Sequence, residues 1–233
     1  MINHTSANNA SLLSRVLTVG SVAEGGTLSL LPGIDLASLC DVLELRVDTW
    51  PQEAATGVAF AKTCPVPVLV TARCSEEGGQ NNLSAAERDR LTRLFLPKAA
   101  LLDVEIASMQ DLSGLVADAK SGGTQVVASY HDFAGTPPLE SLKAKRDAAL
   151  AAGADLVKFA TTLRRSADIA TLAALLEEPG HPALSVMGMG PLGRVSRLLF
   201  AQLGSVLNYG YLDRATVPGQ WPAARLRELI REL

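Results

Sequence analysis

Eight short apolar runs recur along the chain, and their spacing limits the fold more than any other feature of the sequence. Each run has the length and character of a buried strand. They cover residues 15–21, 41–47, 66–73, 100–106, 124–130, 155–160, 182–188 and 205–211. Most of the segments between them have apolar residues at helical spacing, so strand and helix alternate. This alternation indicates βα units around a parallel sheet.

The clearest predicted helices cover residues 84–98 and 223–233. Ser84 and Glu87 begin the first in the S-x-x-E order of a capping box. The apolar residues expected to share its buried face are Leu91, Leu94, Phe95 and Leu96. Those of the last helix are Leu226, Leu229, Ile230 and Leu233.

Chain length favours one fold class for this alternation. Eight strands with intervening helices in 233 residues suit a (β/α)8 TIM barrel, an α/β fold of about 250 residues, better than a doubly wound sheet. No Pro-rich or Ser-rich linker interrupts the pattern, so residues 15–233 are predicted to form a single barrel domain. Residues 1–14 are polar and lack the cationic start and apolar core of a signal peptide, and we expect a mobile arm there.

Composition excludes several classes of partner. The net charge of -3 is spread without long like-charged runs, so we expect no binding to nucleic acid and none to a membrane surface. Three cysteines, Cys40, Cys64 and Cys74, form no CxxC pair and show no zinc spacing. Their odd number does not suggest a disulfide framework, which favours a reducing, cytoplasmic location.

Lys158 is the only charged residue in the apolar run Leu156-Val157-Lys158-Phe159-Ala160. Burial disfavours the ammonium form and lowers a lysine pKa, which raises the fraction of free amine that can attack a carbonyl. The alternative is a structural lysine paired with a buried carboxylate. This run alone leaves both interpretations open.

Polar residues gather where the predicted strands end, which is where barrel enzymes place their reactive groups. Glu44, Arg46 and Asp48 alternate along the second run, and Glu44 and Arg46 are expected to point inward and pair. Arg73 ends the third run, Asp103 and Glu105 end the fourth, His131 follows the fifth, and Lys158 lies late in the sixth. A ring of structural ion pairs would explain the paired charges but not His131 and Lys158.

Residues 188–193 spell GxGxxG, the pattern of a dinucleotide-binding turn, and Asp213 lies at the spacing of a ribose-binding acid. We reject that interpretation because too little chain follows for the second half of a nucleotide-binding fold and because Pro191 lacks an N–H. The glycines are expected instead to expose a helix N-terminus to an anion, with Arg194 or Arg197 supplying charge.

Other chemistries are less well supported. Asp103, Glu105 and His131 could hold a divalent metal, but the neighbouring arginines and lysine would compete for the carboxylates. No GxSxG nucleophile elbow is present. Cys74 beside Arg73 is expected to be a plain half-buried cysteine. His4 and His181 are expected to be surface residues.

Six motifs taken together resemble type I 3-dehydroquinate dehydratase, and they occur in the order of that family. They are Glu44-Leu45-Arg46-Val47-Asp48, Thr71-Ala72-Arg73 with Glu77-Gly78-Gly79, Ser129-Tyr130-His131-Asp132-Phe133, Val157-Lys158-Phe159-Ala160, Gly193-Arg194-Val195-Ser196-Arg197 and Pro218-Gly219-Gln220. The resemblance spans about residues 16–233. It implies a (β/α)8 lyase, commonly a homodimer, that converts 3-dehydroquinate to 3-dehydroshikimate and water in the shikimate pathway of aromatic amino acid biosynthesis. It implies no cofactor and no metal.

The resemblance also implies roles for individual residues. The Schiff-base lysine falls on Lys158, the general acid/base on His131, and the glutamate that orients the histidine on Glu77. Lys158 would attack the C3 ketone, and the iminium would acidify C2–H. His131 would take that proton and return one to the departing C1 hydroxyl.

Substrate-binding roles carried over from the family fall on six further residues. Glu44, Arg46 and Arg73 would hold the ring hydroxyls, and Arg197 would hold the carboxylate through two parallel hydrogen bonds. Thr216, where many relatives have serine, and Gln220 lie on segment 213–220, which we expect to be a lid over the substrate. Ser21 is a candidate from the first strand. Residues 22–36 match little of the family.

Two other hypotheses remain open. A class I aldolase would use the same lysine but gives no reason for His131, Arg197 and Gln220. A non-catalytic barrel that binds an acidic metabolite would need a broken pair of Lys158 and His131, and both residues are present.

Overall fold

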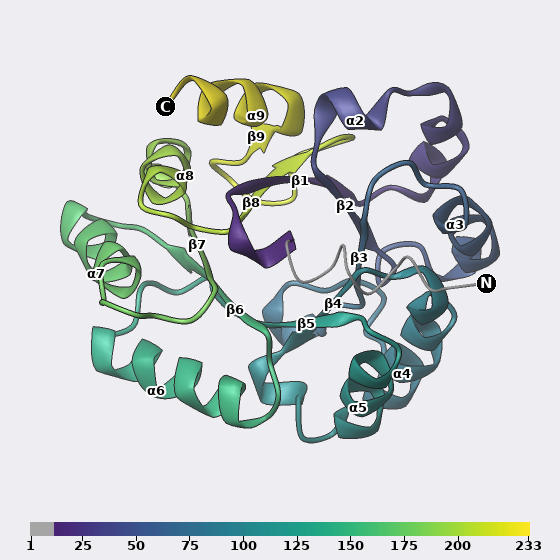
Figure 1. Ribbon diagram of the computed structural model, residues 1–233, viewed down its shortest axis with the longest axis horizontal. Coiled ribbons are helices and arrows are strands. Elements are labelled where there is room, and N and C mark those ends of the chain that lie inside the picture. Colours follow the sequence, from purple (N-terminus) through teal and green to yellow (C-terminus); the bar gives the residue numbers. More distant parts are fainter. Residues whose placement is uncertain (1–11) are drawn as a thin grey trace.

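The chain folds into a barrel of parallel strands surrounded by helices, as Figure 1 shows for the computed structural model, which describes residues 12–233. The barrel strands are β1 (Leu17–Val22), β2 (Val42–Arg46), β3 (Val68–Thr71), β4 (Leu101–Glu105), β5 (Gln125–Asp132), β6 (Leu156–Thr162), β7 (Leu184–Met189) and β8 (Leu207–Tyr211). Neighbours pair in parallel in the order β7-β6-β5-β4-β3-β2-β1-β8, and a short strand β9 (Trp221–Pro222) adds to β8. Each predicted run overlaps one barrel strand, so the predicted (β/α)8 fold class is confirmed.

Serine side chains help to close the barrel between β7 and β8. Ser185 Oγ accepts a hydrogen bond from the Leu207 N–H at 2.8 Å, and Ser205 Oγ accepts one from the Val186 N–H at 2.9 Å. The Val206 N–H donates to the carbonyl of Leu184 at 2.8 Å. Buried backbone donors need partners, and at this junction two hydroxyls provide them.

An outer ring of helices covers the strands. The α-helices are α2 (Leu36–Leu39), α3 (Ala54–Ala61), α4 (Ala85–Arg93), α5 (Ser113–Ser121), α6 (Leu139–Ala151), α7 (Ser166–Leu176), α8 (Gly193–Gln202) and α9 (Ala223–Glu232). Short 3-10 helices lie at η1 (Leu12–Ser14), η2 (Gly25–Ser29), η3 (Leu31–Gly33), η4 (Pro51–Glu53), η5 (Ser75–Glu77), η6 (Leu96–Lys98) and η7 (Ile106–Ser108). The capping box of Ser84 and Glu87 is present at the start of α4, as predicted.

The alternation of side chains along the strands produces two kinds of core. Outward-facing strand residues pack against the covering helices in two clusters. Val126 and Val157 belong to one of these clusters. Inward-facing residues such as Leu17, Leu101 and Leu156 fill the barrel interior, where Leu12 of η1 joins them. A filled interior leaves the ends of the barrel for binding.

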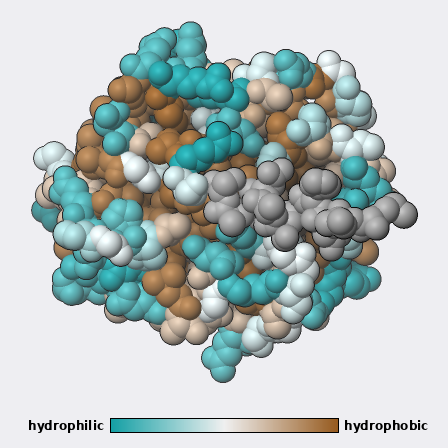
Figure 2. Space-filling view, viewed as in Figure 1, coloured by the Kyte–Doolittle hydropathy of each residue, from teal (hydrophilic) through white to brown (hydrophobic). Residues whose placement is uncertain are grey.

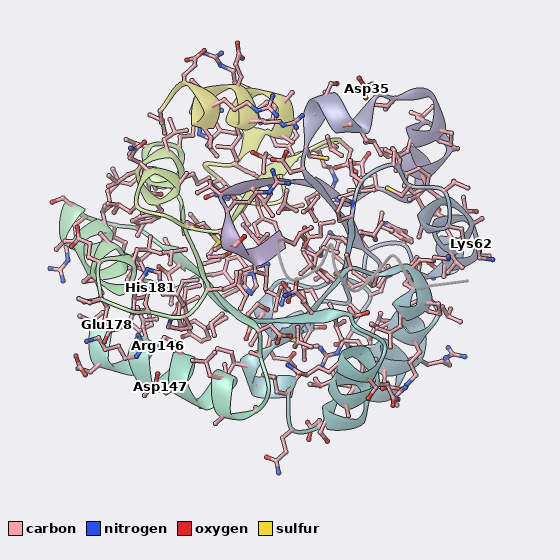
Figure 3. All side chains as sticks on the ribbon, in the orientation of Figure 1. Asp35, Lys62, Arg146, Asp147, Glu178 and His181 are labelled. Carbon is pink, nitrogen blue, oxygen red and sulfur yellow. The ribbon has the colours of Figure 1, made fainter. Side chains whose placement is uncertain are left out.

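The outer surface matches this layered core. Figure 2 shows hydrophilic residues distributed around the periphery, with hydrophobic residues visible between them. An ion pair joins Arg146 of α6 to Glu178, which follows α7, and both side chains lie far from the barrel axis in Figure 3. None of the helices in the described part of the chain is long and apolar enough to cross a membrane.

Some predicted details differ from the structure. Strand β5 runs to Asp132, so His131 lies within the strand and does not follow it. Strand β6 runs to Thr162, which puts Lys158 at its third position instead of near its end. Leu94 was predicted on the buried face of its helix but is 52% exposed, because α4 ends at Arg93. The predicted arm, residues 1–14, lies outside the described residues except for η1.

Candidate active site

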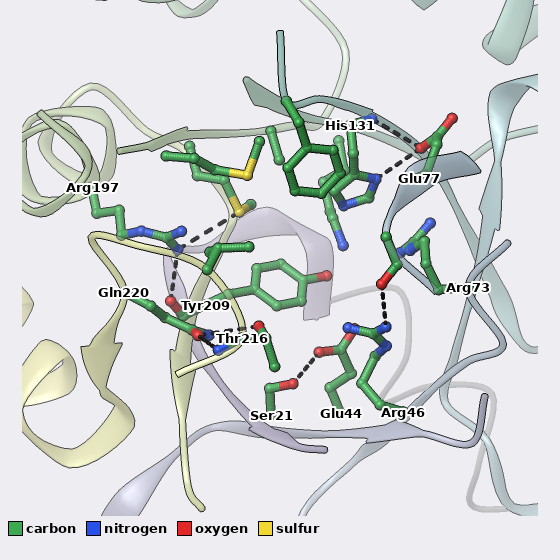
Figure 4. Close-up of a pocket in the computed structure, with 17 residues that line it drawn as sticks. Ser21, Glu44, Arg46, Arg73, Glu77, His131, Arg197, Tyr209, Thr216 and Gln220 are labelled. Atoms are coloured by element: carbon green, nitrogen blue, oxygen red, sulfur yellow. Dashed lines mark hydrogen bonds and ion pairs between the residues drawn. The ribbon is translucent and has the colours of Figure 1, made fainter. Parts of the chain in front are cut away.

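A single pocket brings together all ten residues that the sequence nominated for catalysis and substrate binding. It lies at the carboxyl ends of the strands, and Figure 4 shows its side chains. The ten nominated residues in its wall are Ser21, Glu44, Arg46, Arg73, Glu77, His131, Lys158, Arg197, Thr216 and Gln220. They come from the strands, from the segment between β3 and η5 (Arg73), from η5, from α8 and from the loop after β8.

Lys158 projects from β6 into the base of this pocket and is 3% exposed. Its Nζ lies 2.8 Å from Asp103 Oδ2 and 4.2 Å from the centre of the Tyr209 ring. Burial lowers the pKa of Lys158, and the positive charge of Arg73 lowers it further, although Asp103 acts in the opposite direction. The lysine therefore has both features considered from sequence, since it is buried within a pocket and paired with a carboxylate.

Asp103 is held in place by an ion-pair network behind the lysine. Arg73 donates to Asp103 Oδ1 at 2.8 Å and to Glu105 Oε1 at 3.0 Å, and Ser129 Oγ donates to Asp103 Oδ1 at 2.6 Å. Arg88 anchors the other oxygen of Glu105 at 2.5 Å. Although burial alone would raise it, the positive charges of Arg73 and Lys158 lower the pKa of Asp103 to about 2. Asp103 is therefore a fixed anion beside the amine, and Arg73 is largely occupied in holding it.

The expected pairing of Glu44 with Arg46 is wrong. Arg46 instead donates two hydrogen bonds to the Asp48 carboxylate, of 2.9 and 2.8 Å. Glu44 accepts hydrogen bonds from Ser21 Oγ at 2.6 Å and Thr71 Oγ1 at 2.8 Å. The hydroxyls on β1 and β3 lie on either side of β2, so they reach Glu44 across the sheet. Ser21 thus lies in the site and holds the Glu44 carboxylate.

His131 and Glu77 form a second hydrogen-bonded unit on the opposite side of the pocket. Glu77 Oε2 lies 2.8 Å from His131 Nδ1 and accepts the His131 backbone N–H at 2.9 Å. Burial, together with the charges of Arg73, Lys158 and Arg46, lowers the pKa of His131 well below its usual value. The imidazole is therefore neutral at pH 7. Because an ionised Glu77 can only accept at Nδ1, Nε2 is left as the free base.

Register places this base on the same inner surface as the amine. Ser129 pairs with Lys158 across β5 and β6, and His131 follows two residues later on β5. Residues two apart on a strand face the same side. Both side chains therefore point into the barrel.

Glu77 gives the site a predicted pH dependence. Burial raises the pKa of Glu77 to about 7, against the lowering effect of Arg73. Below that pH the carboxyl gains a proton and no longer fixes the Nδ1–H tautomer, so we expect kcat/KM to fall as pH drops through about 7. Glu77→Gln should remove this acidic limb, leaving any fall at lower pH to the imidazole itself. Glu76→Gln, at an exposed neighbour in η5, should retain the wild-type profile; a limb near pH 7 in Glu77→Gln would contradict the assignment.

Arg197 is a buried guanidinium for which the described residues provide no carboxylate. It extends from α8, is 2% exposed, and donates to the carbonyl of Tyr209 at 2.8 Å. Its Nε has no hydrogen-bond partner among residues 12–233. Burial lowers the pKa of Arg197 to about 10, so it stays charged at neutral pH. A buried unpaired cation that faces a pocket favours an anionic ligand.

The GxGxxG turn has a packing role next to Arg197. A side chain at Gly188 would meet Leu163 and Ser196 at 2.2 and 2.4 Å. Gly190 has a φ of 81° and donates its N–H to the Pro218 carbonyl at 3.0 Å. The glycines therefore let the loop after β8 pack on the turn. Of the two arginines proposed for an anion, Arg197 lines the pocket, whereas Arg194 stacks on Trp221.

The predicted lid segment, residues 213–220, lies against the pocket opening. Gln220 Oε1 accepts from the Thr216 N–H at 2.9 Å and lies 3.3 Å from Thr216 Oγ1. Asp213 anchors the start of the segment by accepting the N–H groups of Ala23 and Glu24 at 2.8 and 2.7 Å. This contact fastens one end of the loop to the segment after β1. The expectation that residues 22–36 match little of the family is wrong from residue 27 onward, where the family match begins.

The metal and thiol alternatives receive no support from the geometry. Asp103 and Glu105 are engaged by cations, and no cluster of three or more potential metal ligands occurs within residues 12–233. Burial, reinforced by the nearby Glu105, raises the pKa of Cys74 to about 11, so its thiol is not activated. His181 is half-buried between α7 and β7, with Nδ1 donating to the carbonyl of Pro182 at 2.7 Å, and Figure 3 places it near the outer edge.

Several pocket residues were not nominated from sequence. They are Gly78, Phe133, Ala160, Met187, Met189, Tyr209 and Val217. The strand period could have found Tyr209, because it lies two residues after the inward-facing Leu207. Phe133, Ala160 and Met189 lie within the sequence motifs but were given no role there, and no motif marks Met187 or Val217.

The fold and the pocket define a class: a (β/α)8 barrel with an enclosed, charged site for a small molecule at the carboxyl ends of its strands. Comparison with known proteins identifies the family. The family model described as type I 3-dehydroquinase matches residues 27–233. The 3-dehydroquinate dehydratase of Aromatoleum aromaticum is 34% identical over 207 residues, covering 83% of this chain and 80% of that protein. That of Thermococcus gammatolerans is 33% identical over 193 residues, covering 82% and 86%.

A solved structure gives the same result. The crystal structure of 3-dehydroquinate dehydratase from Geobacillus kaustophilus superimposes with a TM-score of 0.84 at 26% identity, over 94% of this chain and 91% of that one. The chain therefore belongs to the type I 3-dehydroquinase family. It is an enzyme, a hydro-lyase, in agreement with the resemblance seen in its motifs.

Proposed function

We propose that this enzyme dehydrates 3-dehydroquinate to 3-dehydroshikimate through a Schiff base on Lys158, as a step of the shikimate pathway. The observation that carries the proposal is the position of Lys158 Nζ, buried in a pocket that also contains the neutral imidazole of His131. Burial of the amine favours its nucleophilic form, and the imidazole supplies a base in the same enclosed space.

The first steps form the iminium. The Lys158 amine adds to the C3 carbonyl carbon, and the carbonyl oxygen leaves as water after gaining two protons. The resulting iminium carries one positive charge next to the Asp103 carboxylate, which stays ionised because its pKa is about 2. A fixed anion 2.8 Å from the nitrogen stabilises that charge without taking its proton.

Elimination then follows at the neighbouring carbons. His131 Nε2 removes the C2 proton, and the electron pair of the C–H bond moves to the iminium nitrogen to give an enamine. Its return expels the C1 hydroxyl, which leaves as water with the proton from His131. Water hydrolyses the conjugated iminium, which releases the enone product and restores the Lys158 amine.

The charged wall of the pocket suits the remaining groups of this substrate. Arg197 is proposed to bind the carboxylate, with Thr216 and Gln220 of the adjacent loop closing over it. Glu44 and Arg46 are proposed to bind ring hydroxyls, and each is oriented by its neighbours before the ligand arrives. Arg73 is proposed to contribute mainly through its charge, because its guanidinium already binds Asp103, Glu105 and Ser129.

The setting of the enzyme is also proposed. Residues 15–233 would be the catalytic domain, acting without a cofactor in aromatic amino acid biosynthesis. The three cysteines are free, which suits a reducing cytoplasm. A homodimer is proposed from the family resemblance, and the exposed apolar side chains of Val195 and Leu199 on α8 offer a surface that a second copy could cover.

The alternatives from sequence account for less of this site. A class I aldolase would explain Lys158 but not the hydrogen-bonded His131 and Glu77 together with an unpaired Arg197. A barrel that only binds a metabolite would have no need for a neutral base beside a buried amine. Neither alternative uses the complete set of charged groups.

Conversion of 3-dehydroquinate tests the proposed function directly. Purified protein incubated with 3-dehydroquinate should develop the ultraviolet absorbance of a conjugated enone, because the product has a C=C bond in conjugation with its ketone. Mass spectrometry should show the loss of one water from the substrate. Sugar phosphates that serve aldolases should remain unchanged, and conversion of those compounds without any enone would overturn the proposal.

A further inference from the structure

The Tyr209 hydroxyl is a buried polar group without a partner inside the candidate active site. Tyr209 lies on β8, is 5% exposed, and lines the pocket. Among the described residues, its Oη has no hydrogen-bond partner. Leaving a buried hydroxyl unpaired is unfavourable for folding. A group retained in this state within a binding pocket suggests a partner that comes with the ligand.

The position of Tyr209 connects the two groups proposed to hold opposite ends of the substrate. Its backbone carbonyl accepts a hydrogen bond from Arg197 at 2.8 Å, and the face of its ring lies 4.2 Å from Lys158 Nζ. In Figure 4 the hydroxyl points away from Arg197 and toward the centre of the pocket. Pairing of Tyr209 with Val19 on β1 fixes the backbone from which the ring extends.

The surroundings keep this phenol protonated. Burial raises the pKa of Tyr209 well above its usual value, and the nearby carboxylates of Glu44 and Asp103 raise it further. The hydroxyl is therefore a neutral donor throughout the pH range in which His131 and Glu77 titrate. A ligand oxygen placed beside the carboxylates of Glu44 and Asp103 needs a hydrogen-bond donor. The Tyr209 hydroxyl can be that donor.

We propose that Tyr209 positions the substrate for attack, with its hydroxyl donating a hydrogen bond to an oxygen at the ketone end of 3-dehydroquinate and its ring face supporting the cation that forms on Lys158. The inference rests on the proposed function and adds Tyr209, which lies outside the six motifs that resemble the family. A hydrogen bond to the ketone oxygen draws electron density from the carbonyl carbon, which assists addition of the amine. The ring attracts the iminium through its π face.

Tyr209→Phe isolates the hydroxyl because it keeps the ring. We expect kcat/KM for 3-dehydroquinate to fall about five- to tenfold, the effect of losing one net hydrogen bond. Adduct formation in the presence of borohydride should slow by a similar factor but still reach completion. The unfolding temperature should be equal to or higher than that of the wild type, because the variant no longer buries an unpaired hydroxyl.

Tyr211→Phe is the matched control, since it makes the same change two residues along β8 at a side chain outside the pocket wall. Its kinetics should equal those of the wild type. Wild-type kinetics in Tyr209→Phe would overturn the inference while leaving the proposed function intact. A fall in activity accompanied by a lower unfolding temperature would assign the hydroxyl a structural role and also overturn it. If the wild-type protein forms neither product nor adduct, the proposed function fails and this inference fails with it.

Discussion

Lys158→Ala is expected to abolish both turnover of 3-dehydroquinate and the covalent adduct that borohydride traps on the wild-type protein. Without the amine no iminium can form, so the electron sink that acidifies the C2–H bond is lost. The rate should fall on the order of 10⁶-fold, the scale seen when an enzyme loses its nucleophile. Intact-mass analysis after borohydride treatment should show one ligand mass added to the wild type and none to the variant.

The ion pair of Lys158 with Asp103 makes a stability control necessary. Removing the lysine leaves Asp103 bound to Arg73 and Ser129, so the fold should survive with a lower unfolding temperature. Lys145→Ala is a matched control because Lys145 Nζ also lies over an aromatic ring, 4.4 Å from the centre of Tyr130, but outside the pocket. That variant should retain the adduct. An adduct of unchanged yield in Lys158→Ala would show that another amine reacts and would refute the proposed mechanism.

The fold was predictable because its main signal is local. A short apolar run marks each strand whatever its partner, and eight such runs in a chain of this length leave few architectures. The ends of the elements were less accessible. His131 and Asp132 look like the start of a loop, yet pairing of His131 with Ala160 on β6 extends β5 through both residues.

The candidate site was predictable to the extent that barrel topology determines it. Parallel strands bring their carboxyl ends together. Residues as far apart in sequence as Glu44 and Lys158 could therefore be assigned to the same end of the barrel. The individual pairings could not be foreseen from spacing within a strand. Glu44 bonds to Ser21 and Thr71 on neighbouring strands, and this choice depends on register across the sheet. The strand period could have placed Tyr209 in the pocket, but no motif reveals that its hydroxyl lacks a partner among the described residues.

The network around Asp103 explains how a buried lysine can be both paired and reactive. Asp103 would favour the ammonium form, but Arg73 neutralises part of that effect while orienting the same carboxylate. Burial is the largest effect, so the net result is a lowered pKa for Lys158. In the proposed mechanism the same carboxylate also stabilises the iminium, so one anion would serve the resting enzyme and the intermediate.

His131→Ala is expected to slow turnover severely while leaving the carbonyl chemistry of Lys158 in place. Loss of a general acid/base typically lowers the rate by about 10²- to 10⁴-fold. The borohydride adduct should still form, because the variant keeps the amine, Asp103 and the pocket for the carboxylate. Steady-state kinetics and adduct mass measured on the same preparation separate the two effects.

His181→Ala is the control for this experiment, because His181 lies in a loop outside the pocket and its removal should leave kcat unchanged. In His131→Ala, Glu77 keeps the backbone N–H of residue 131 as a donor, so the local fold should be preserved. Loss of the adduct in parallel with turnover would mean that His131 is needed to form the iminium as well as to eliminate water. Such a result would contradict the proposed roles, in which Lys158 binds the ketone covalently and His131 transfers the proton.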